Sequence, residues 1–332
     1  MVLIIAEAGV NHNGDIKLAK ELIDIAAESG ADFVKFQSFK ADRLVTPSAL
    51  KAEYQVSLEG DSESQLTMLR RLELSLDMHH DLINHCALKK IRFLSTGFDV
   101  ESINMLLNLG QEVFKIPSGE ISNLLYLRHI GRVAKSVILS TGISSMNEIG
   151  SALSILEHAG TPRDKITVLH CTSAYPVPMV DVNLRAMQTI QKTFNLSVGY
   201  SDHSLGIEIP IAAVALGASI IEKHFTVDRN LPGPDHKASL EPAEFANMVA
   251  AIRNIEVALG DGVKRPMPSE MINLSSIRQS IVARVKIGVG EIFSDENLTT
   301  KRPGNGISPM HWQKIIGKSA LREYQPDEMI EL

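Results

Sequence analysis

Residues 3–37 read LIIAEAGVNHNGDIKLAKELIDIAAESGADFVKFQ, and they set the pattern for most of the chain. The first part, Leu3–Ala8, is a short apolar run typical of a buried strand. Asp15–Ser29 then carries apolar side chains at helical spacing, with lysines and glutamates on its other faces. After Gly30, a residue suited to ending a helix, Asp32–Gln37 reads as a second strand. A strand, a helix and a strand in this order predict a βαβ unit with parallel strands.

The same alternation continues as far as residue 260. Amphipathic segments such as Met78–Lys89, Val100–Leu109, Ser145–Ala159 and Pro242–Leu259 separate the apolar runs. Eight such units in about 250 residues favour a closed (β/α)₈ TIM barrel over an open sheet. We therefore predict the α/β class, with a barrel at residues 1–260. The strand candidates are Leu3–Ala8, Asp32–Gln37, Arg92–Thr96, Val113–Pro117, Ser136–Thr141, Ile166–Cys171, Ser197–Tyr200 and Ser219–His224.

Three segments depart from this pattern. The connection from Ser38 to about Gln65 is unusually long, and a loop of this length predicts a functional lid. Residues 261–275 contain two prolines and read as a linker. Residues 276–332 begin with an alternating, strand-like run at Ser280–Lys286 and are rich in turn residues, so they predict a small β-rich domain.

Composition excludes several classes of function. The chain has 332 residues, 44% of them hydrophobic, and a formal net charge of −6. These are globular values, and the negative charge argues against nucleic acid or an anionic membrane as the main partner. No stretch approaches the roughly 18 apolar residues that a membrane helix needs. The two cysteines, Cys86 and Cys171, give no disulfide framework, so we expect a cytoplasmic protein.

Polar side chains stand at the predicted strand ends, which in a (β/α)₈ barrel share the face where active sites lie. His203 and His224 end adjacent strands, so their imidazoles could converge on one divalent cation with open positions for substrate. Two nitrogens completed by water or carboxylate suit Mn²⁺, Co²⁺ or Zn²⁺. The alternative is that each histidine is an ordinary hydrogen-bonding residue.

Lys35 and Lys115 lie inside otherwise apolar strands, where an unpaired ammonium group would be costly. They either pair with a neighbouring carboxylate or bind an anionic substrate. Hydroxyls at Ser118, Ser173 and Ser201 could complete a cradle for phosphate or carboxylate. The first strand is followed by neither a Walker loop nor a G-x-G-x-x-G motif, so a nucleotide is not indicated.

Three carboxylates are candidate acid–base groups. Glu7 and Glu120 stand at strand ends, where each is also explained as a structural carboxylate. Asp235 follows the last strand in a Pro-Gly-Pro-Asp loop, where its side chain either turns inward or belongs to the turn.

Taken together, these residues resemble the sialic acid synthase family almost from end to end. The motifs that carry the resemblance are Ala6-Glu7-Ala8-Gly9-Val10-Asn11-His12-Asn13-Gly14, Lys35-Phe36-Gln37, Ile116-Pro117-Ser118-Gly119-Glu120, Leu139-Ser140-Thr141-Gly142, His170-Cys171-Thr172, Tyr175-Pro176, Gly199-Tyr200-Ser201-Asp202-His203, Glu222-Lys223-His224-Phe225, Gly233-Pro234-Asp235 and Lys301-Arg302-Pro303-Gly304-Asn305-Gly306.

The resemblance implies a (β/α)₈ barrel followed by an antifreeze-like (SAF) domain, in a domain-swapped homodimer. It implies condensation of phosphoenolpyruvate with an N-acetylated mannose-type sugar, giving a nine-carbon nonulosonic acid and phosphate. The metal at His203 and His224 would be Mn²⁺, with Co²⁺ or Mg²⁺ as alternatives, and would polarise the sugar aldehyde. Arg302 would reach the partner's site and contact the sugar's N-acyl group.

The resemblance also implies roles for the other site residues. Glu120 would manage the attacking water, and Glu7 or Asp235 would contact sugar hydroxyls or metal-bound water. Gln37 and Tyr175 would line the site, Tyr175 on the sugar side. The expected ligands of phosphoenolpyruvate are Lys35, Gln37, Thr96, Lys115, Ser118, Ser173 and Ser201.

Two positions depart from the family pattern. Gly97 replaces a frequent proline after Ser-Thr, and Ser173 replaces a frequent asparagine, which puts one ligand contact in doubt. Within the family, the motifs around Glu7, Lys35 and Asp235 resemble those of bacterial legionaminic acid synthases more than those of N-acetylneuraminate synthases. Phe36 and Phe39 would suit a 6-deoxy sugar. We therefore expect 2,4-diacetamido-2,4,6-trideoxymannose as the substrate, with N-acetylmannosamine as the alternative.

Two competing hypotheses remain. A related synthase acting on a sugar phosphate would need additional Arg or Lys residues for a second phosphate, and few strand ends supply them. A non-catalytic sugar-binding barrel would be expected to have lost His203, His224 or Lys115, and all three are present.

Overall fold

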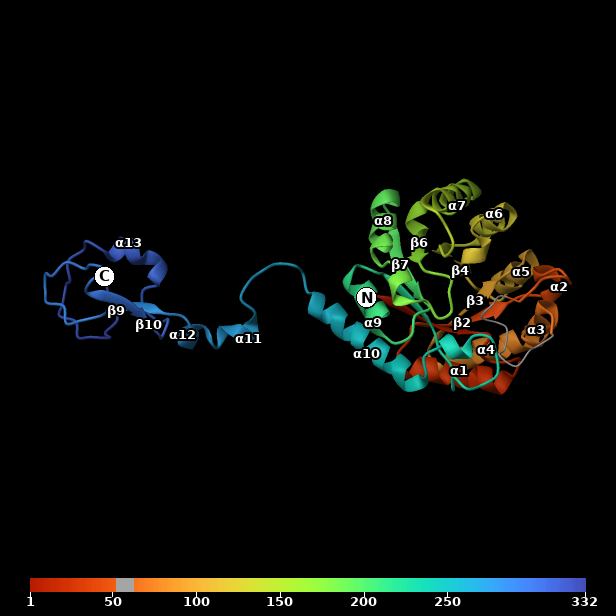
Figure 1. The fold of residues 1–332 in the computed structure, drawn as a ribbon, viewed down its shortest axis with the longest axis horizontal. Helices are drawn as coiled ribbons and strands as arrows, with labels where there is room; N and C mark the ends of the chain where they lie inside the picture. The colour runs from red at the N-terminus through yellow and green to blue at the C-terminus, as the bar shows by residue number, and fades with distance from the viewer. Residues whose placement is uncertain (52–62) are drawn as a thin grey trace. The chain divides into compact units, whose positions relative to one another are not determined.

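The computed structural model describes residues 1–51 and 63–332, and these form two compact units. We call Met1–Gly260 the barrel unit and Asp261–Leu332 the C-terminal unit. Each is described by itself (Figure 1). The predicted linker, 261–275, contains helix α11 (Pro268–Met271) and groups with the C-terminal unit.

The barrel unit contains one sheet of eight strands in the order β3-β2-β1-β8-β7-β6-β5-β4, and each hydrogen-bonded pair is parallel. This arrangement confirms the predicted (β/α)₈ fold, since right-handed helical crossovers return each strand to the same direction. The strands are β1 (Leu3–Gly9), β2 (Phe33–Ser38), β3 (Arg92–Gly97), β4 (Val113–Ile116), β5 (Ser136–Ser140), β6 (Ile166–His170), β7 (Ser197–Asp202) and β8 (Ile220–His224).

Side chains close the barrel between β3 and β4. The two strands lie side by side, but among the described residues no backbone ladder joins them. The side-chain amide of Gln111 makes two hydrogen bonds to the backbone of β3, as a neighbouring strand would. Its nitrogen donates to the Ser95 carbonyl and its oxygen accepts from the Ser95 amide, both at 2.8 Å. The Tyr126 hydroxyl donates to the Gly97 carbonyl at 2.5 Å. We call these contacts the β3–β4 seam.

The surrounding helices begin at polar caps that satisfy free backbone amides. The Asp15 side chain accepts from the Lys17 amide at the start of α1, and Ser145 and Glu148 form a capping box on α7. The helices of the barrel unit are α1 (Ile16–Glu28), α2 (Ala41–Leu44), α3 (Gln65–Arg71), α4 (Leu76–Lys89), α5 (Val100–Asn108), α6 (Leu124–Val133), α7 (Met146–Ala159), α8 (Arg185–Phe194), α9 (Glu208–Ala215) and α10 (Pro242–Leu259).

Two apolar layers lie on opposite faces of the strands. A small cluster that includes Ile5, Phe33 and Leu94 fills the barrel interior, and a larger one packs the strands against the helices. Because side chains alternate between the two faces of a strand, Phe36 belongs to the helix-facing layer and has no exposed surface. The hypothesis that Phe36 shapes the sugar pocket is therefore wrong, while Phe39 does line the cavity described below.

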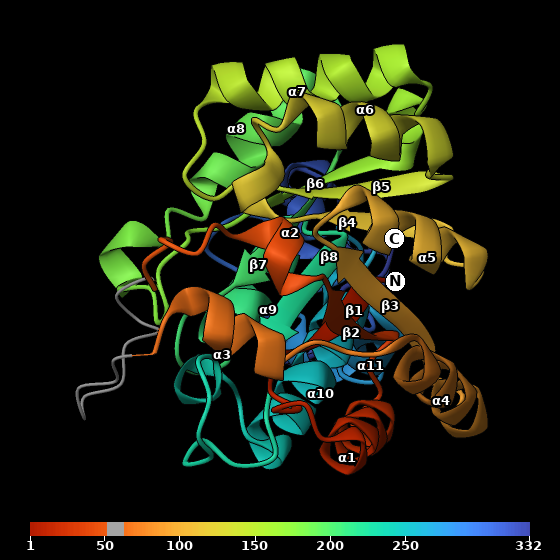
Figure 2. The same cartoon turned by 90° about the vertical axis from the view of Figure 1, so that its right-hand side faces the viewer.

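The long connection after β2 contains structure on both sides of the part that is not described. Helices α2 and α3 pack together in a third apolar cluster, which includes Val10, Phe39 and Met68. Figure 2 views the barrel unit from the side on which these helices lie. The predicted lid covers Ser38 to about Gln65, and its central part, 52–62, lies outside the described residues.

The C-terminal unit is small and has its own apolar core. Strands β9 (Ser280–Ala283) and β10 (Leu298–Lys301) pair antiparallel, and the short helices α12 (Leu274–Ile277) and α13 (Trp312–Ile315) accompany them. Buried side chains of Ile281, Phe293 and Tyr324 form the centre of the core. In the described parts of the chain, no helix has both the length and the apolar character needed to cross a membrane.

Candidate active site

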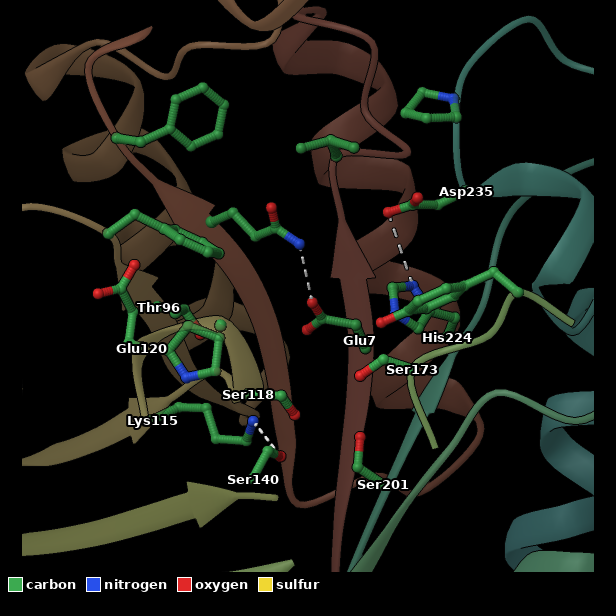
Figure 3. A pocket seen from close by; sticks show the side chains of 18 of the residues that line it. Glu7, Thr96, Lys115, Ser118, Glu120, Ser140, Ser173, Ser201, His224 and Asp235 are labelled. Carbon is green, nitrogen blue, oxygen red and sulfur yellow. Dashed lines mark hydrogen bonds and ion pairs between the residues drawn. The ribbon is translucent and has the colours of Figure 1, made fainter. Parts of the chain in front are cut away.

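A cavity of about 940 Å³ opens at the carboxyl ends of the barrel strands. Its size lies within the usual range for small-molecule sites. Figure 3 shows the side chains that converge on it. Every site residue predicted in the barrel unit lies on its lining: Glu7, Lys35, Gln37, Thr96, Lys115, Ser118, Glu120, Ser173, Tyr175, Ser201, His203, His224 and Asp235. Arg302 is exposed on the C-terminal unit.

Two lysines and two glutamates form a buried ion-pair network. Lys35 Nζ lies 2.8 Å from Glu222 Oε2 and 3.3 Å from Glu7 Oε2. Lys115 Nζ lies 3.5 Å from Glu222 Oε1 and donates a 2.7 Å hydrogen bond to Ser140 Oγ. All four charged side chains are almost completely buried. The structure therefore combines both interpretations of the lysines: they pair with carboxylates, and they line a cavity.

Burial and pairing set the protonation of these groups. Burial lowers the pKa of Lys115, and the Lys35 charge nearby adds to this. Burial also opposes the charge on Lys35, but the carboxylates of Glu222 and Glu7 outweigh it and raise its pKa. Burial raises the pKa of Glu7 to about 7. At Glu222 the burial effect is overcome by Lys115 and Lys35, which lower its pKa.

Hydroxyl groups surround the lysines. The Gly142 amide donates to Ser118 Oγ at 2.8 Å, and Ser118 Oγ lies 3.2 Å from Cys171 Sγ. Ser201 donates to Glu222 Oε1 at 2.9 Å. The Thr96 hydroxyl is buried and has no hydrogen-bond partner among the described residues. Such an arrangement of ammonium and hydroxyl donors suits a phosphate or a carboxylate.

Gly142 stands at the edge of this cradle, where a larger residue is expected to displace two serine side chains. A β-carbon there would lie 2.1 Å from Ser173 Oγ and 2.9 Å from Ser118 Oγ, too close for either side chain to keep its position. In Gly142→Ala we expect KM for the anionic substrate to rise about 10- to 100-fold, equivalent to losing one or two charge-assisted hydrogen bonds. Steady-state kinetics measures this, and an unchanged KM would contradict it.

The two histidines lie side by side at the ends of β7 and β8, with ring centroids 5.6 Å apart. His203 Nδ1 donates to the Thr172 carbonyl at 2.8 Å, which leaves its Nε2 unprotonated. His224 Nδ1 is buried without a hydrogen-bond partner among the described residues and lies 3.9 Å from Asp235 Oδ2. Burial lowers the pKa of both imidazoles, so both are neutral near pH 7.

This donor set fits a divalent cation. Neutral imidazoles are good ligands for transition metals, and an unpartnered buried nitrogen is otherwise costly. Within the described ranges, no group of three or more His, Cys, Asp and Glu side chains is arranged to enclose a metal ion. An ion held by His203 and His224 alone would have two protein ligands, and its other positions would be taken by water or substrate oxygens.

Polar side chains form a belt around Gly9, which has a φ of +54° at the end of β1. A β-carbon on Gly9 would be 3.4 Å from Glu7 Oε1 and 3.5 Å from both Gln37 Nε2 and Asp235 Oδ2, so these three groups converge there. Gln37 also donates to Glu7 Oε1 at 3.3 Å. Asp235 therefore turns inward, and burial raises its pKa to about 6. We call Glu7, Gln37 and Asp235 the polar belt.

Tyr175 and Glu120 complete the lining. The Tyr175 ring lies 4.1 Å from the His203 ring and 5.9 Å from the His224 ring, centroid to centroid. Glu120 is half-buried in the turn after β4, and Asn123 donates to its Oε2 at 2.7 Å. Both side chains can therefore contact a molecule that occupies the cavity.

The main residue that sequence reasoning did not assign is Glu222. Its position on β8, next to Lys223 and His224, does not indicate that it forms ion pairs with both Lys35 and Lys115. The alternation of side chains contained a signal: Glu222 and His224 are two residues apart and must share a face of β8. Lys223 points the other way and pairs with Asp202 at 2.5 Å.

His12 holds the loop after β1, and its titration is expected to weaken the fold in acid. The Gly14 amide donates to His12 Nδ1 at 3.0 Å, and burial lowers the pKa of His12 to about 4. The unfolded chain binds this proton near pH 6.5, so stability is complete above pH 6.5 and falls as pH drops toward 4. In His12→Asn, urea unfolding should show about 2–3 kcal/mol less loss of stability between pH 7.5 and 4. An equal loss in both proteins would contradict this.

The site and fold together define the class of protein. The NeuB family model matches residues 22–264, and the SAF domain model matches residues 278–331. The chain therefore belongs to the NeuB family, which confirms the resemblance to sialic acid synthases and the C-terminal SAF domain.

Individual proteins of known name are also similar to this chain. The chain is 56% identical to the N,N'-diacetyllegionaminic acid synthase of Campylobacter jejuni, over 99% of this chain and 98% of that one. It is 48% identical to the Legionella pneumophila enzyme of the same name, over 95% and 89%. Among solved structures, the N-acetylneuraminic acid synthetase of Leptospira borgpetersenii is similar, with 39% identity and a TM-score of 0.72 over 82% of this chain and 90% of that one.

Proposed function

We propose that the protein condenses phosphoenolpyruvate with 2,4-diacetamido-2,4,6-trideoxymannose, producing N,N'-diacetyllegionaminic acid and phosphate. One observation carries the proposal. Two buried lysines, surrounded by serine and threonine hydroxyls, lie in the same cavity as two neutral imidazoles. Lysines and hydroxyls suit an anionic substrate, and imidazoles suit a metal that can bind a carbonyl oxygen. The relatives named above support the choice of sugar.

Phosphoenolpyruvate would bind at the lysine network. In the substrate-free network the charges of Lys35 and Lys115 are balanced by Glu222 and, when it is ionised, by Glu7. A phosphate and a carboxylate entering the cavity bring negative charge to the same point and favour a protonated, neutral Glu7. Ser118, Ser173, Ser201 and the unpartnered Thr96 hydroxyl would then donate to substrate oxygens.

The reaction needs two additions and one bond cleavage. Carbon 3 of the enol attacks the aldehyde carbon of the open-chain sugar and forms the new carbon–carbon bond. Water adds at carbon 2, and the tetrahedral intermediate releases phosphate by breaking its C–O bond. Glu120 would take the proton from this water, and Glu7 or Asp235 would orient sugar hydroxyls.

His203 and His224 would hold a divalent cation, Mn²⁺ first and Co²⁺ or Mg²⁺ as alternatives. When bound, this ion supplies Lewis-acid polarisation of the aldehyde. Tyr175 packs against both imidazoles and fixes their orientation. Gln37 lines the cavity beside Glu7, to which it donates a hydrogen bond, so it can also hydrogen-bond the sugar.

Phosphate release tests this function directly. The protein is incubated with phosphoenolpyruvate and each candidate sugar, with added Mn²⁺ or with EDTA. We expect release that depends on sugar and metal, together with a nonulosonic acid identified by mass spectrometry. N-Acetylmannosamine is the alternative substrate, supported by the similarity to the Leptospira enzyme. No turnover with either sugar and Mn²⁺ would overturn the proposal.

We propose a homodimer in which the partner covers the mouth of the barrel. Apolar side chains are exposed in the first turn of α6 and on the next three βα connections: Leu125 by 74%, Ile143 by 88%, Val180 by 89% and Leu205 by 50%. Apolar residues gathered on one face are typical of an interaction surface. The partner's C-terminal domain would bring its own Arg302 to the sugar, as the family resemblance implies.

Mixing two inactive variants tests this arrangement. Arg302→Ala and His224→Ala are unfolded together in denaturant and refolded, so that mixed dimers form. If Arg302 acts across the interface, each mixed dimer has one intact site, and about a quarter of the wild-type activity returns. Activity no higher than that of either variant alone would contradict the arrangement.

Cysteine chemistry supports placement in the cytoplasm. Cys86 and Cys171 are both buried free thiols. Burial raises the pKa of Cys86 to about 12, so this thiol stays protonated and unreactive. Free thiols of this kind suit a reducing compartment.

A further inference from the structure

One side of the cavity is apolar, in contrast to the charged network at its floor. We call this side the apolar wall, defined by Val10, Phe39, Leu44, Val45, Met68 and Leu69. These residues come from the end of β1, the segment after β2, and helices α2 and α3, and they pack in a cluster separate from the main core. The wall is therefore a local structure, made mostly by the described parts of the long connection after β2.

The strands impose a gradient of polarity that ends at this wall. Along β2 and the segment that follows it, every second residue faces the cavity: Lys35, then Gln37, then Phe39. Because successive residues on one face are about 6–7 Å apart, the lining changes outward from a cation to an amide to a phenyl ring. Next to it, Thr96 and Phe98 repeat the change from hydroxyl to ring.

Direct contacts hold the wall in place. The rings of Phe39 and Phe98 meet edge to face, with centroids 6.2 Å apart at 87°. Around them, Glu73 accepts from the Ala41 amide at 2.8 Å and from Lys40 Nζ at 2.6 Å, which fixes the start of α2. The polar side chains of these helices, such as Arg70 and Asp42, pair with each other on the exposed face. Apolar side chains of α2 and α3 face the cavity, and the polar Gln65 at the start of α3 lines it beside them.

A substrate that matches this gradient is anionic at one end, hydroxylated in the middle and apolar at the other end. We propose that the apolar wall binds the deoxygenated C6 methyl end of the sugar and makes the enzyme select 6-deoxy over 6-hydroxy sugars. This rests on the proposed function, in which phosphoenolpyruvate occupies the floor and the polar belt contacts the sugar hydroxyls. The methyl end then lies against Phe39 and Met68.

The expected selectivity has a physical limit. A methyl group gains from burial against the wall, whereas a hydroxyl in the same position loses its water and gains no partner from the wall residues. A hydrophobic pocket rejects an added hydroxyl by about 10- to 100-fold. We expect a preference of this size for 2,4-diacetamido-2,4,6-trideoxymannose over 2,4-diacetamido-2,4-dideoxymannose, which differ only at C6.

The test compares these two sugars with wild-type protein and three variants. Met68→Gln keeps the length of the side chain, and Val45→Thr keeps its shape, while each places a polar group on the wall. Both should bring the preference to within about 3-fold of equality. Leu66→Gln is the matched control, because Leu66 packs against the same cluster from α3 but does not line the cavity. It should keep the wild-type preference.

Two readouts separate this inference from the proposed function. Calorimetry gives the ratio of dissociation constants, and phosphate release gives the ratio of kcat/KM. A wild-type ratio near one in binding would overturn the role of the wall even if both sugars react. Absence of binding by both sugars would overturn it as well. A ratio unchanged in Met68→Gln and Val45→Thr would also overturn it. Selective binding that the variants abolish, without phosphate release, would support the wall and overturn the proposed reaction.

Discussion

His224→Ala is expected to reduce metal-dependent kcat/KM by at least about 10³-fold, since Lewis-acid stabilisation of developing charge contributes several kcal/mol. Burial lowers the pKa of His224, so the wild-type side chain presents a neutral imidazole to the cavity. Alanine removes this donor and leaves His203 alone. Phosphate release at saturating Mn²⁺ measures the loss, and metal binding by calorimetry should weaken in parallel.

A matched control separates loss of the ligand from loss of the fold. His170 also lies at a strand end, but it hydrogen-bonds the Val182 carbonyl at 3.0 Å and does not line the cavity. His170→Gln should keep its metal affinity. Circular dichroism should show the same folded spectrum for both variants. Activity of His224→Ala equal to that of the wild type would rule out the assigned role.

The second large effect is expected for Glu222→Gln. The substitution leaves Lys35 and Lys115 facing one another with only Glu7 to balance them. Removing one partner of a buried ion pair costs about 3–5 kcal/mol, because the remaining charge stays buried. We expect a loss of this size in urea unfolding at pH 7.5 without substrate, and a large fall in kcat/KM for phosphoenolpyruvate.

The pH dependence of this variant follows from the lysines. Burial already lowers the pKa of Lys115, and Glu222 opposes that effect. Without Glu222 the pKa of Lys115 falls further, so this lysine loses its proton at a lower pH. As pH rises, KM for phosphoenolpyruvate should therefore begin to increase at a lower pH in Glu222→Gln than in the wild type. An equal change with pH in both proteins would contradict this reasoning.

Two further variants complete the series. Glu222→Asp keeps the charge and should retain most of the stability. The double variant Lys115→Met/Glu222→Gln removes both charges, so it should regain stability relative to Glu222→Gln but remain inactive. Stability that does not recover would mean that Glu222 acts through packing rather than through its charge.

Local pattern predicted most of the barrel. Apolar runs bounded by turn residues located every strand to within two residues, and β1 at Leu3–Gly9 is one example. Helix α10 begins and ends at the predicted residues, since Pro242 suits a first turn and Gly260 suits a helix end. The site could be predicted from the polar residues at the strand ends, because a (β/α)₈ barrel brings those ends together on one face.

Other features depend on contacts that local pattern does not contain. The alternation rule shows that Glu222 faces inward, but only the tertiary structure shows that it lies between Lys35 and Lys115. Phe36 was assigned to the sugar pocket although its neighbours Lys35 and Gln37 face inward, and the same rule would have excluded it. The packing of α2 against α3 joins two parts of the long connection after β2. The periodicity of the sequence could not predict this contact.

The β3–β4 seam is held by side-chain hydrogen bonds, which mutation can remove. A backbone ladder survives nearly any substitution, because every residue except proline carries the same amide and carbonyl. Here the contacts come from the side chains of Gln111 and Tyr126. Substitution of Gln111 and Tyr126 would therefore remove these hydrogen bonds without altering any strand. Sequence changes at Gln111 and Tyr126 can therefore alter how firmly β3 is held, without changing the site residues at the ends of the other strands.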